Sequence, residues 1–344
     1  MSQTDLVHPF PEPPEIGQLI EVAAGVLWAR LPLPFRLNHV NIYLIEDGDG
    51  WAVLDTGIGT EAAKAGWDAL IDALPSRKRL TRLIVTHSHP DHIGLAGWLS
   101  RRFNIGVWTS QTTWLTCLYA SLSPGALDAL PYREIYARHG LAPEIVDVVV
   151  TQGHGYLRMV EPLPPTFRRI VAGDTLEVGR RSFQVLSGDG HAAEQLMLYS
   201  GRDGLFFAAD QVIVKITPNI GVWAVDPAGD PLALYLRSLR TLRESLPADV
   251  LVLPGHQLPF IGLHERCRSL TEHHEERCRL ISAAAAKRPS TVADLLPVIF
   301  HLKLDPHQTG FAFGEVHAHV NYMVERGELR WVDDGSGVAR VVTV

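Results

Sequence analysis

The stretch Thr86-His87-Ser88-His89-Pro90-Asp91-His92 decides how the fold of this chain is interpreted. It directly follows an apolar run, Leu83-Ile84-Val85, that is typical of a buried strand, and its proline suits the first turn of a helix. A loop between a strand and a helix can hold several side chains toward one point. Three imidazoles and a carboxylate within six residues therefore predict a site for zinc or a similar transition metal.

Further polar residues end apolar runs elsewhere in the chain. Each of these runs is short enough and apolar enough to be a buried strand. The residues at their ends are Asp55, His191, Asp210 and His256. Because a layered α/β fold gathers its chemistry at the C-terminal ends of its strands, we expect these side chains to lie close to the histidine-rich loop.

The spacing His-x-His-x-Asp-His, followed by a distant His, Asp and His at strand ends, resembles the metallo-β-lactamase superfamily over roughly residues 20–265. The resemblance implies an α/β fold, an αββα sandwich with a two-metal site at one edge of its sheets. Carried over by position, the residues that would hold the first metal are His87, His89 and His191. Those that would hold the second are Asp91, His92 and His256, with Asp210 bridging the two metals.

The full ligand set matches the two-metal branch of the family, of the glyoxalase II, lactonase and RNase Z type. The β-lactamase branch often has a cysteine in the second metal site. Since no motif position holds Cys117, Cys267 or Cys278, β-lactamase activity is not expected. The expected cofactors are two divalent metal ions, with zinc as the leading choice and manganese or iron as alternatives, because first-row metals share these ligands.

The ligand types indicate hydrolysis. A bound metal lowers the pKa of water toward neutrality, and two metals about 3.5–4 Å apart can stabilise both the attacking and the leaving oxygen. An ester, thioester, lactone or phosphodiester is the expected substrate. As is proposed in related enzymes, Asp91 would also help to protonate the leaving group. Asp55 is expected to orient a ligand histidine, and capping a helix that begins near Thr60 is an equally open alternative.

Composition favours a soluble cytoplasmic enzyme. The chain has 344 residues, of which 46% are hydrophobic, and no apolar run approaches the length of a membrane helix. The N-terminus has neither the basic region nor the apolar core of a signal peptide. Three widely spaced cysteines argue against a disulfide framework. The net charge of -7 gives no general attraction to nucleic acid.

The pattern of apolar residues predicts three parts, an extended arm at 1–18, a catalytic domain at 19–265 and a C-terminal domain at 266–344. Helices are expected at 60–74 and 91–102. Strands are expected at 22–33, 39–46, 51–55, 82–86, 183–187, 195–200, 205–209 and 250–254. Two strand-rich halves that both donate ligands fit a sandwich.

Residues 103–177 form a long insert within the predicted catalytic domain. It is rich in tryptophan and tyrosine and is predicted to consist of helices broken near residues 124–125, 140 and 162–165. We hypothesise a helical cap that shapes an apolar substrate pocket, and packing onto the sandwich or a second subunit is the alternative. Candidate substrate contacts are His154, which lies between two glycines, and Lys215 and Asn219, which follow Asp210. His154 and Lys215 could equally be solvated surface residues.

The C-terminal part is predicted to form helices at 262–288, 292–300 and 310–326, followed by a β-hairpin. This order resembles a small winged-helix module, and some related hydrolases with such a tail cleave single-stranded RNA. Helix 310–326 has one Arg and no Lys, whereas a helix that reads nucleic acid carries several cations. We therefore expect a packing or dimerisation element in a homodimer, without nucleic acid or membrane partners. The pairs expected not to bind metal are His273 with His274, on a solvated face, and His317 with His319.

Three classes of function remain. The leading prediction is a two-metal hydrolase of a small-molecule ester, thioester or lactone. The second is a metal-dependent endoribonuclease or phosphodiesterase, which the tail suggests. The third is a non-hydrolytic iron redox protein. The resemblance favours hydrolysis over the third class, because diiron electron carriers of this family tend to have a carboxylate where this chain has His89.

Overall fold

The computed structural model describes residues 6–75, 79–122, 130–333 and 335–344. It divides into two compact units. The first unit comprises Met1–Leu122, Tyr156–Pro218 and Arg243–Arg266, and the second comprises Ser123–Gly155, Asn219–Leu242 and Cys267–Val344. The domain boundaries drawn from the sequence stay a prediction.

The first unit contains a seven-stranded sheet whose strands are ordered as in the chain. Neighbours are antiparallel as far as the fourth strand and parallel from there on. The strands are β1 (Ile20–Ala23), β2 (Val26–Pro32), β3 (His39–Asp47), β4 (Gly50–Leu54), β5 (Leu80–Ile84), β6 (Val107–Thr109) and β7 (Arg168–Arg169). The prediction of one strand over 22–33 is wrong, because Gly25 adopts a φ of 68° and turns the chain between β1 and β2.

A six-stranded sheet completes the first unit, in the order β13-β12-β11-β10-β9-β8. Only β11 and β12 pair in parallel. The strands are β8 (Thr175–Val178), β9 (Arg181–Gly188), β10 (Gln195–Ser200), β11 (Leu205–Ala209), β12 (Leu251–Pro254) and β13 (Phe260–Ile261). The described part of the N-terminal arm joins this sheet, because Val7 pairs with Ile261.

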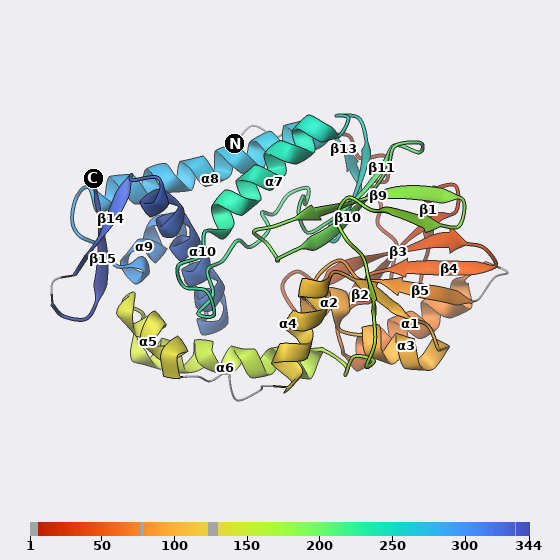
Figure 1. Ribbon diagram of the computed structural model, residues 1–344, viewed down its shortest axis with the longest axis horizontal. Coiled ribbons are helices and arrows are strands. Elements are labelled where there is room, and N and C mark those ends of the chain that lie inside the picture. Colours follow the sequence, from red (N-terminus) through yellow and green to blue (C-terminus); the bar gives the residue numbers. More distant parts are fainter. Residues whose placement is uncertain (1–5, 76–78, 123–129, 334) are drawn as a thin grey trace. The chain divides into compact units, whose positions relative to one another are not determined.

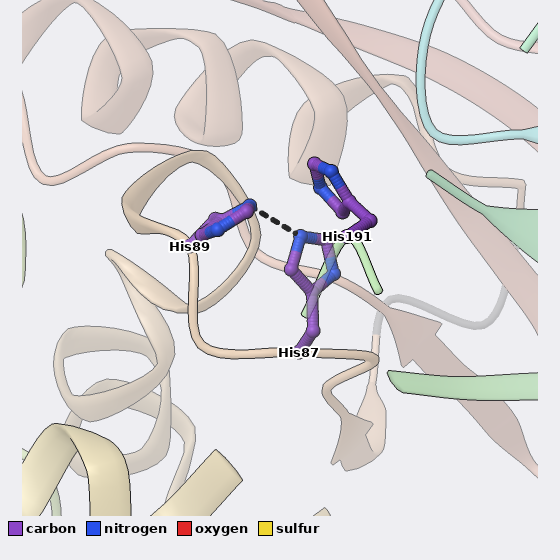
Figure 2. Close-up of side chains that lie close together, drawn as sticks. All are labelled: His87, His89 and His191. Carbon is purple, nitrogen blue, oxygen red and sulfur yellow. Dashed lines mark hydrogen bonds between the residues drawn. The ribbon is translucent and has the colours of Figure 1, made fainter. Parts of the chain in front are cut away.

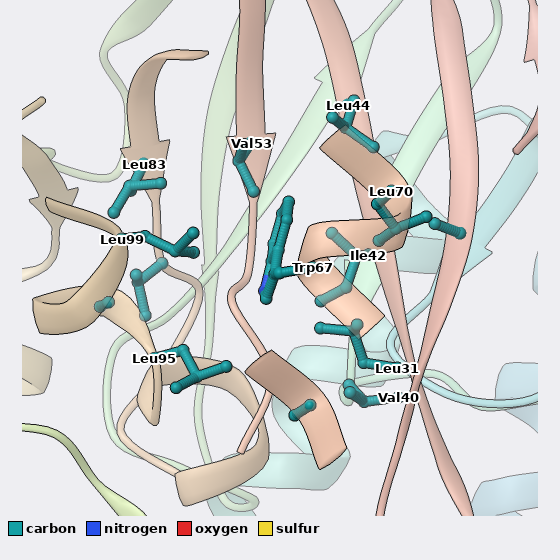
Figure 3. Packing of buried hydrophobic residues seen from close by; sticks show 14 of the residues in the cluster. Leu31, Val40, Ile42, Leu44, Val53, Trp67, Leu70, Leu83, Leu95 and Leu99 are labelled. Atoms are coloured by element: carbon teal, nitrogen blue, oxygen red, sulfur yellow. The ribbon is translucent and has the colours of Figure 1, made fainter. Parts of the chain in front are cut away.

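The two sheets pack face to face through one apolar core. In that core the rings of Tyr43 and Phe207, one from each sheet, lie 5.3 Å apart edge to face. Helices α1 (Glu61–Ala73) and α3 (Ala96–Phe103) cover the outer face of the seven-stranded sheet (Figure 1). Trp67 fills the centre of this second core (Figure 3), and its indole donates a hydrogen bond to the carbonyl of Thr56, 2.8 Å away. The predicted α/β sandwich is therefore confirmed.

The expected helix at 91–102 is two helices, α2 (Pro90–Ile93) and α3. The separation has a hydrogen-bonding cause. The amide of Leu95 donates to the carbonyl of Gly57, 3.0 Å away, and the carbonyl of Gly94 accepts from the amide of Glu161, 2.8 Å away. Since both backbone groups are used outside the helix, the i to i+4 ladder stops between α2 and α3.

The predicted insert is only partly helical. It contains helices α4 (Gln111–Leu122), α5 (Leu130–Arg138) and α6 (Pro143–Met159), but also β6, β7 and β8. The break near residue 140 is confirmed, since Gly140 separates α5 from α6 with a φ of 88°. The break at 162–165 is confirmed by the end of α6, and residues 124–125 lie outside the described part.

The second unit contains the C-terminal elements α8 (Leu263–Ala285), α9 (Val292–Ile299), α10 (Pro306–Glu325), β14 (Leu329–Asp333) and β15 (Ala339–Thr343). Thr291 caps α9, in a capping box with Asp294. Helix α10 begins earlier than expected because Asp305 caps it and accepts from the amide of Gln308. The order of helix, helix and hairpin is confirmed, and its likeness to a winged helix stays a prediction.

Helix α7 (Pro231–Ser245) lies between β11 and β12 in the chain. Among the residues that the structure describes, no helix is both long enough and apolar enough to cross a membrane.

The prediction that His273 and His274 lie on a solvated face is wrong for His274, which is fully buried. Its Nδ1 lies 3.1 Å from Nε2 of His319, whose own Nδ1 lies 2.7 Å from the carbonyl of Glu315. The ring of Tyr235 packs edge to face against His274. His274 and His319 therefore belong to the interior of the second unit, where their hydrogen bonds satisfy the ring nitrogens that burial removes from water.

Buried histidines should make the second unit sensitive to acid. Burial lowers the pKa of His317 and of His319 to about 3, with help from His139 for the first and from Arg277 for the second. An unfolded histidine takes up a proton near pH 6.5, so the unfolded state binds more protons between these two values. The free energy of unfolding therefore falls as pH drops below 6.5, by about 1.4 kcal/mol per histidine at about pH 5.5.

Hydrogen exchange of α10 peptides at about pH 7.5 and about pH 5.5, corrected for the intrinsic exchange rate, measures this loss. His317→Phe should reduce the pH dependence, because it removes one of the buried imidazoles. Phenylalanine should be tolerated at this position, because the neighbours His139 and Trp331 are also aromatic. His301→Gln, at an exposed position, is the matched control and should leave the dependence unchanged. Equal pH dependence in His317→Phe and in the wild type would contradict the assignment.

Candidate metal centre

The histidine-rich loop connects β5 to α2. His89 is the N-cap of α2 and Pro90 is its first residue, as the sequence predicts. His87 and His92 are fully buried, while Asp91 keeps a fifth of its side chain exposed. The loop is tied to the second sheet, because the amide of Leu196 donates to the carbonyl of Thr86, 2.8 Å away.

The structure brings all the predicted metal ligands together. The ligands outside the histidine-rich loop each follow a strand of the six-stranded sheet, namely His191 after β9, Asp210 after β11 and His256 after β12. Three groups have ligand atoms that lie within 4.8 Å of one another, and these are His87 with His89 and His191, His87 with His92 and Asp210, and Asp91 with His92 and His256. Figure 2 shows the first group, in which Nε2 of His87 lies 3.0 Å from Nδ1 of His89.

Asp210 contacts ligand atoms of the group that contains His191 and of the group that contains His92 and His256. Its Oδ2 lies 3.2 Å from Nε2 of His256 and 3.5 Å from Nε2 of His191, and its Oδ1 lies 3.5 Å from Nε2 of His92. Asp91 Oδ2 lies 3.3 Å from Nε2 of His256 and 3.7 Å from Nε2 of His92. Asp210 therefore lies between the two groups that the sequence assigns to separate metals.

Hydrogen bonds on Nδ1 fix the rings of three histidines. Nδ1 of His92 lies 2.8 Å from Oδ2 of Asp55, Nδ1 of His256 lies 2.9 Å from the carbonyl of His39, and Nδ1 of His87 lies 2.9 Å from Oγ1 of Thr86. A proton on each Nδ1 leaves each Nε2 with its lone pair directed into the cluster. This is the arrangement by which proteins orient metal-binding imidazoles.

Asp55 follows β4 and does not cap helix α1, because the cap is the side chain of Thr60. Its carboxylate instead accepts from the amide of Thr86 at 2.8 Å and from the Thr86 hydroxyl at 2.9 Å, and contacts His92. The φ of Asp55 is 64°, a conformation that costs energy for a non-glycine residue. The surrounding hydrogen bonds thus hold a strained backbone beside the ligands.

The loop that carries His256 is held by hydrogen bonds from residues that the sequence did not single out. Asn41 Nδ2 donates to the carbonyls of Pro254 and Gln257, and the Arg30 guanidinium donates to the same Gln257 carbonyl at 2.7 Å. The amide of Gln257 donates to Nε2 of His39, 2.9 Å away. These residues lie on β2 and β3, far from the loop in sequence, and no motif marks them.

The donor atoms fit a bound transition metal. Ligands about 2.0–2.2 Å from one tetrahedral zinc ion lie roughly 3.3–3.6 Å from one another, close to the separations within the Asp91, His92 and His256 group. Among the described side chains, Nε2 of His92 and Oδ1 of Asp210 are buried polar atoms that make no hydrogen bond, and the 3.5 Å between them is longer than an ordinary one. Buried polar atoms need partners, and a cation between them would supply one.

Charge in the cluster is arranged around its two carboxylates. Burial opposes the charged form of His92 and His256, but Asp210 and Asp91 outweigh it and raise the pKa of His92 well above its usual value and that of His256 to about 10. Burial lowers the pKa of His89 to about 3. Protons on His92 and His256 thus balance the carboxylates when no cation does, so a binding metal must displace them.

The predicted substrate contacts are less closely placed. Lys215 is exposed, and its amide donates to Oε1 of Gln257, 2.7 Å away, next to His256. Asn219 belongs to the second unit, where its side chain donates to the carbonyl of Phe311. His154 lies within helix α6, although glycines flank it on both sides, and its side chain is outside the described part.

Comparison with known proteins agrees with this geometry. A family model for the metallo-beta-lactamase superfamily matches residues 36–256, and a model for the metallo-beta-lactamase-like C-terminal domain matches residues 278–344. "Probable metallo-hydrolase YqjP" of Bacillus subtilis is 24% identical over 81% of this chain and 87% of that protein. A hydroxyacylglutathione hydrolase of Cereibacter sphaeroides is 24% identical over 75% of this chain and 84% of its own length.

Solved structures indicate the same superfamily. A beta-lactamase domain protein from Burkholderia ambifaria is 36% identical, covers 98% of both chains and superposes with a TM-score of 0.90. A metallo-beta-lactamase family protein from Thermus thermophilus is 27% identical over 94% of this chain and 99% of its own, with a TM-score of 0.79. The chain belongs to the metallo-beta-lactamase superfamily, as a metal-dependent hydrolase.

Proposed function

We propose that this chain is a binuclear metal-dependent hydrolase of a small-molecule ester, thioester or lactone. The observation that carries the proposal is the position of Asp210, with one carboxylate oxygen toward His191 and His256 and the other toward His92. A carboxylate shared between two groups of ligands supports a pair of metals and not a single one. The residues that would hold the first metal are His87, His89 and His191, and those that would hold the second are Asp91, His92 and His256.

Two bound metal ions, with zinc expected and manganese or iron as alternatives, would supply Lewis acidity and a water of lowered pKa. The protein supplies the rest. Asp55, Thr86 and His39 orient the ligand rings through Nδ1. Asp91 is the partly exposed carboxylate of the group, and its Oδ2 faces Nε2 of His92 and of His256. We infer that Asp91 takes up the proton that the attacking water releases at its other oxygen, Oδ1, and passes this proton to the leaving group.

A carbonyl substrate is favoured over RNA or another phosphodiester by helix α10. Residues 312–321 of this helix are all buried, and α10 contains neither Lys nor Arg. A helix that reads nucleic acid exposes several cations along one face. The hydroxyacylglutathione hydrolase among the relatives adds support, because an acyl-glutathione is a thioester. The homodimer and the cytoplasmic location stay predictions.

A mixed substrate panel tests the proposal. The metal-loaded enzyme is assayed on acyl thioesters, lactones, aryl esters, an aryl phosphodiester and single-stranded RNA, with Asp210→Ala as the blank. We expect turnover of one or more carbonyl substrates, absent in the blank. Cleavage of RNA or the phosphodiester alone would overturn the carbonyl assignment, and turnover that survives in the blank would overturn the metal centre.

A further inference from the structure

The hydroxyl of Tyr156 lies beside the histidine-rich loop. It donates a hydrogen bond to the carbonyl oxygen of Ser88, 2.9 Å away. Ser88 is the residue between His87 and His89, two members of the first ligand group. A hydrogen bond to this carbonyl holds the backbone from which both imidazoles project. Neither the ligand motif nor its spacing points to Tyr156.

Tyr156 is itself held by a thiol. Sγ of Cys117, on α4, lies 2.9 Å from the Tyr156 hydroxyl oxygen. Because the tyrosine proton is directed at Ser88, the thiol is the donor in this second contact. Burial raises the pKa of Cys117 to about 11, so the thiol keeps its proton at neutral pH. The result is a chain of two hydrogen bonds from α4 to the ligand loop, and such chains strengthen each member.

The start of α4 is tied to the other loop of the same ligand group. The Thr112 hydroxyl donates to Oε2 of Glu194, 2.5 Å away. Glu194 follows His191 on the loop between β9 and β10 and has a φ of 48°. Its amide donates to Oδ1 of Asp189 at 3.0 Å, which closes the turn around His191. Helix α4 therefore contacts the loop that carries His191 directly and reaches the histidine-rich loop through Tyr156.

The segment after Tyr156 is also hydrogen-bonded to the loop that follows β4 and to the end of α2. The carbonyl of Met159 accepts from the amide of Gly59, and the amide of Glu161 donates to the carbonyl of Gly94, each at 2.8 Å. Gly94 caps α2, the helix that carries His92. The backbone that follows Tyr156 is therefore held to α2, the helix that directly follows the histidine-rich loop. This limits how far the Tyr156 hydroxyl can move from Ser88.

We propose that Tyr156 and α4 form a brace that positions the first metal group, in which Tyr156 is a positioning residue for His87 and His89. The inference rests on the proposed metal centre and adds to it the element that sets its geometry. Removing the Tyr156 hydroxyl should loosen the ligand loop without touching any ligand. Partner residues of metal ligands influence affinity in this way.

The test compares Tyr156→Phe with Tyr119→Phe. Tyr119 is an exposed tyrosine of α4, so it controls for the same chemical change. Zinc is titrated into each chelator-treated protein in competition with a chromophoric chelator, and the thermal stability of each metal-free form is recorded. We expect Tyr156→Phe to bind one of its two zinc ions roughly fivefold more weakly, the effect of one hydrogen bond. Tyr119→Phe should match the wild type.

Equal zinc affinities in Tyr156→Phe and the wild type would overturn the brace and leave the metal centre intact. The same conclusion holds if the thermal stability of the variant falls while its zinc affinity does not change. A wild type that binds no zinc would instead overturn the proposed function itself. If Tyr156→Phe does not fold, Cys117→Ala and Cys117→Ser replace it. Serine keeps a donor, so we expect weaker zinc binding in Cys117→Ala than in Cys117→Ser, and identical affinities in these two would overturn the brace.

Discussion

The Asp210→Ala variant is expected to bind fewer than two metal ions per chain and to lose hydrolysis of every substrate that the wild type accepts. The two carboxylate oxygens of Asp210 face Nε2 of His92 on one side and of His191 and His256 on the other. The variant also leaves the charge of protonated His92 and His256 without its main partner. Altering a residue that merely supports a ligand costs roughly 10- to 100-fold in metal affinity or activity, so a shared ligand should cost more.

Elemental analysis of the dialysed protein and turnover measurements on the same sample check this expectation. Asp49→Ala is the control, because that carboxylate is exposed and pairs across the surface with Arg79. It should retain the metal content and rate of the wild type. An Asp210→Ala protein with two metals and a normal rate would show that Asp210 is not a bridging ligand.

The Gly255→Ala variant should be nearly as damaging, although it removes no ligand. A Cβ at this position would lie 2.2 Å from Oδ1 of Asp210 and 2.9 Å from Cε1 of His92. The backbone cannot retreat easily, because the amide of Gly255 donates to Ala209 and its carbonyl accepts from Asn41, each at 2.7 Å. One methyl group must therefore displace two ligands, and we expect roughly a 10- to 100-fold loss of metal affinity and rate.

Gly106→Ala is the matched control for this variant. A Cβ there meets nothing closer than Nε1 of Trp108, at 3.7 Å, which is an ordinary contact. Circular dichroism should show both variants folded, and zinc competition should separate them. Wild-type zinc affinity in Gly255→Ala would mean that the ligands around Asp210 tolerate displacement and that their close packing has no role in metal binding.

The convergence of the ligands could be predicted from local rules, whereas the αββα sandwich was implied by the resemblance of the ligand motif to a known family. Apolar runs that end in a polar residue mark strand ends, and parallel strands bring such ends to one edge of a sheet. Asp55, His191, Asp210 and His256 could be found this way. The prediction placed the start of α10 too late, although the sequence contains a signal for it, because Pro306 and Gln308 follow the capping residue Asp305.

The remaining features depend on contacts that no sequence window contains. His274 meets His319 across 45 residues, and Tyr156 meets Ser88 across 68. The break between α2 and α3 depends on two hydrogen bonds to groups outside the helix, from the amide of Leu95 to the carbonyl of Gly57 and from the amide of Glu161 to the carbonyl of Gly94. Periodicity reports which face of an element is apolar, but not which distant group will claim a carbonyl or a ring nitrogen.

The number and the positions of the bound metal ions decide whether the centre is binuclear. Crystals of the zinc-loaded wild type would be measured with X-rays on both sides of the zinc absorption edge, so that anomalous scattering marks zinc alone. We expect two peaks, one among His87, His89 and His191 and one among Asp91, His92 and His256, with Asp210 in contact with both. One peak, or peaks away from these residues, would contradict this expectation.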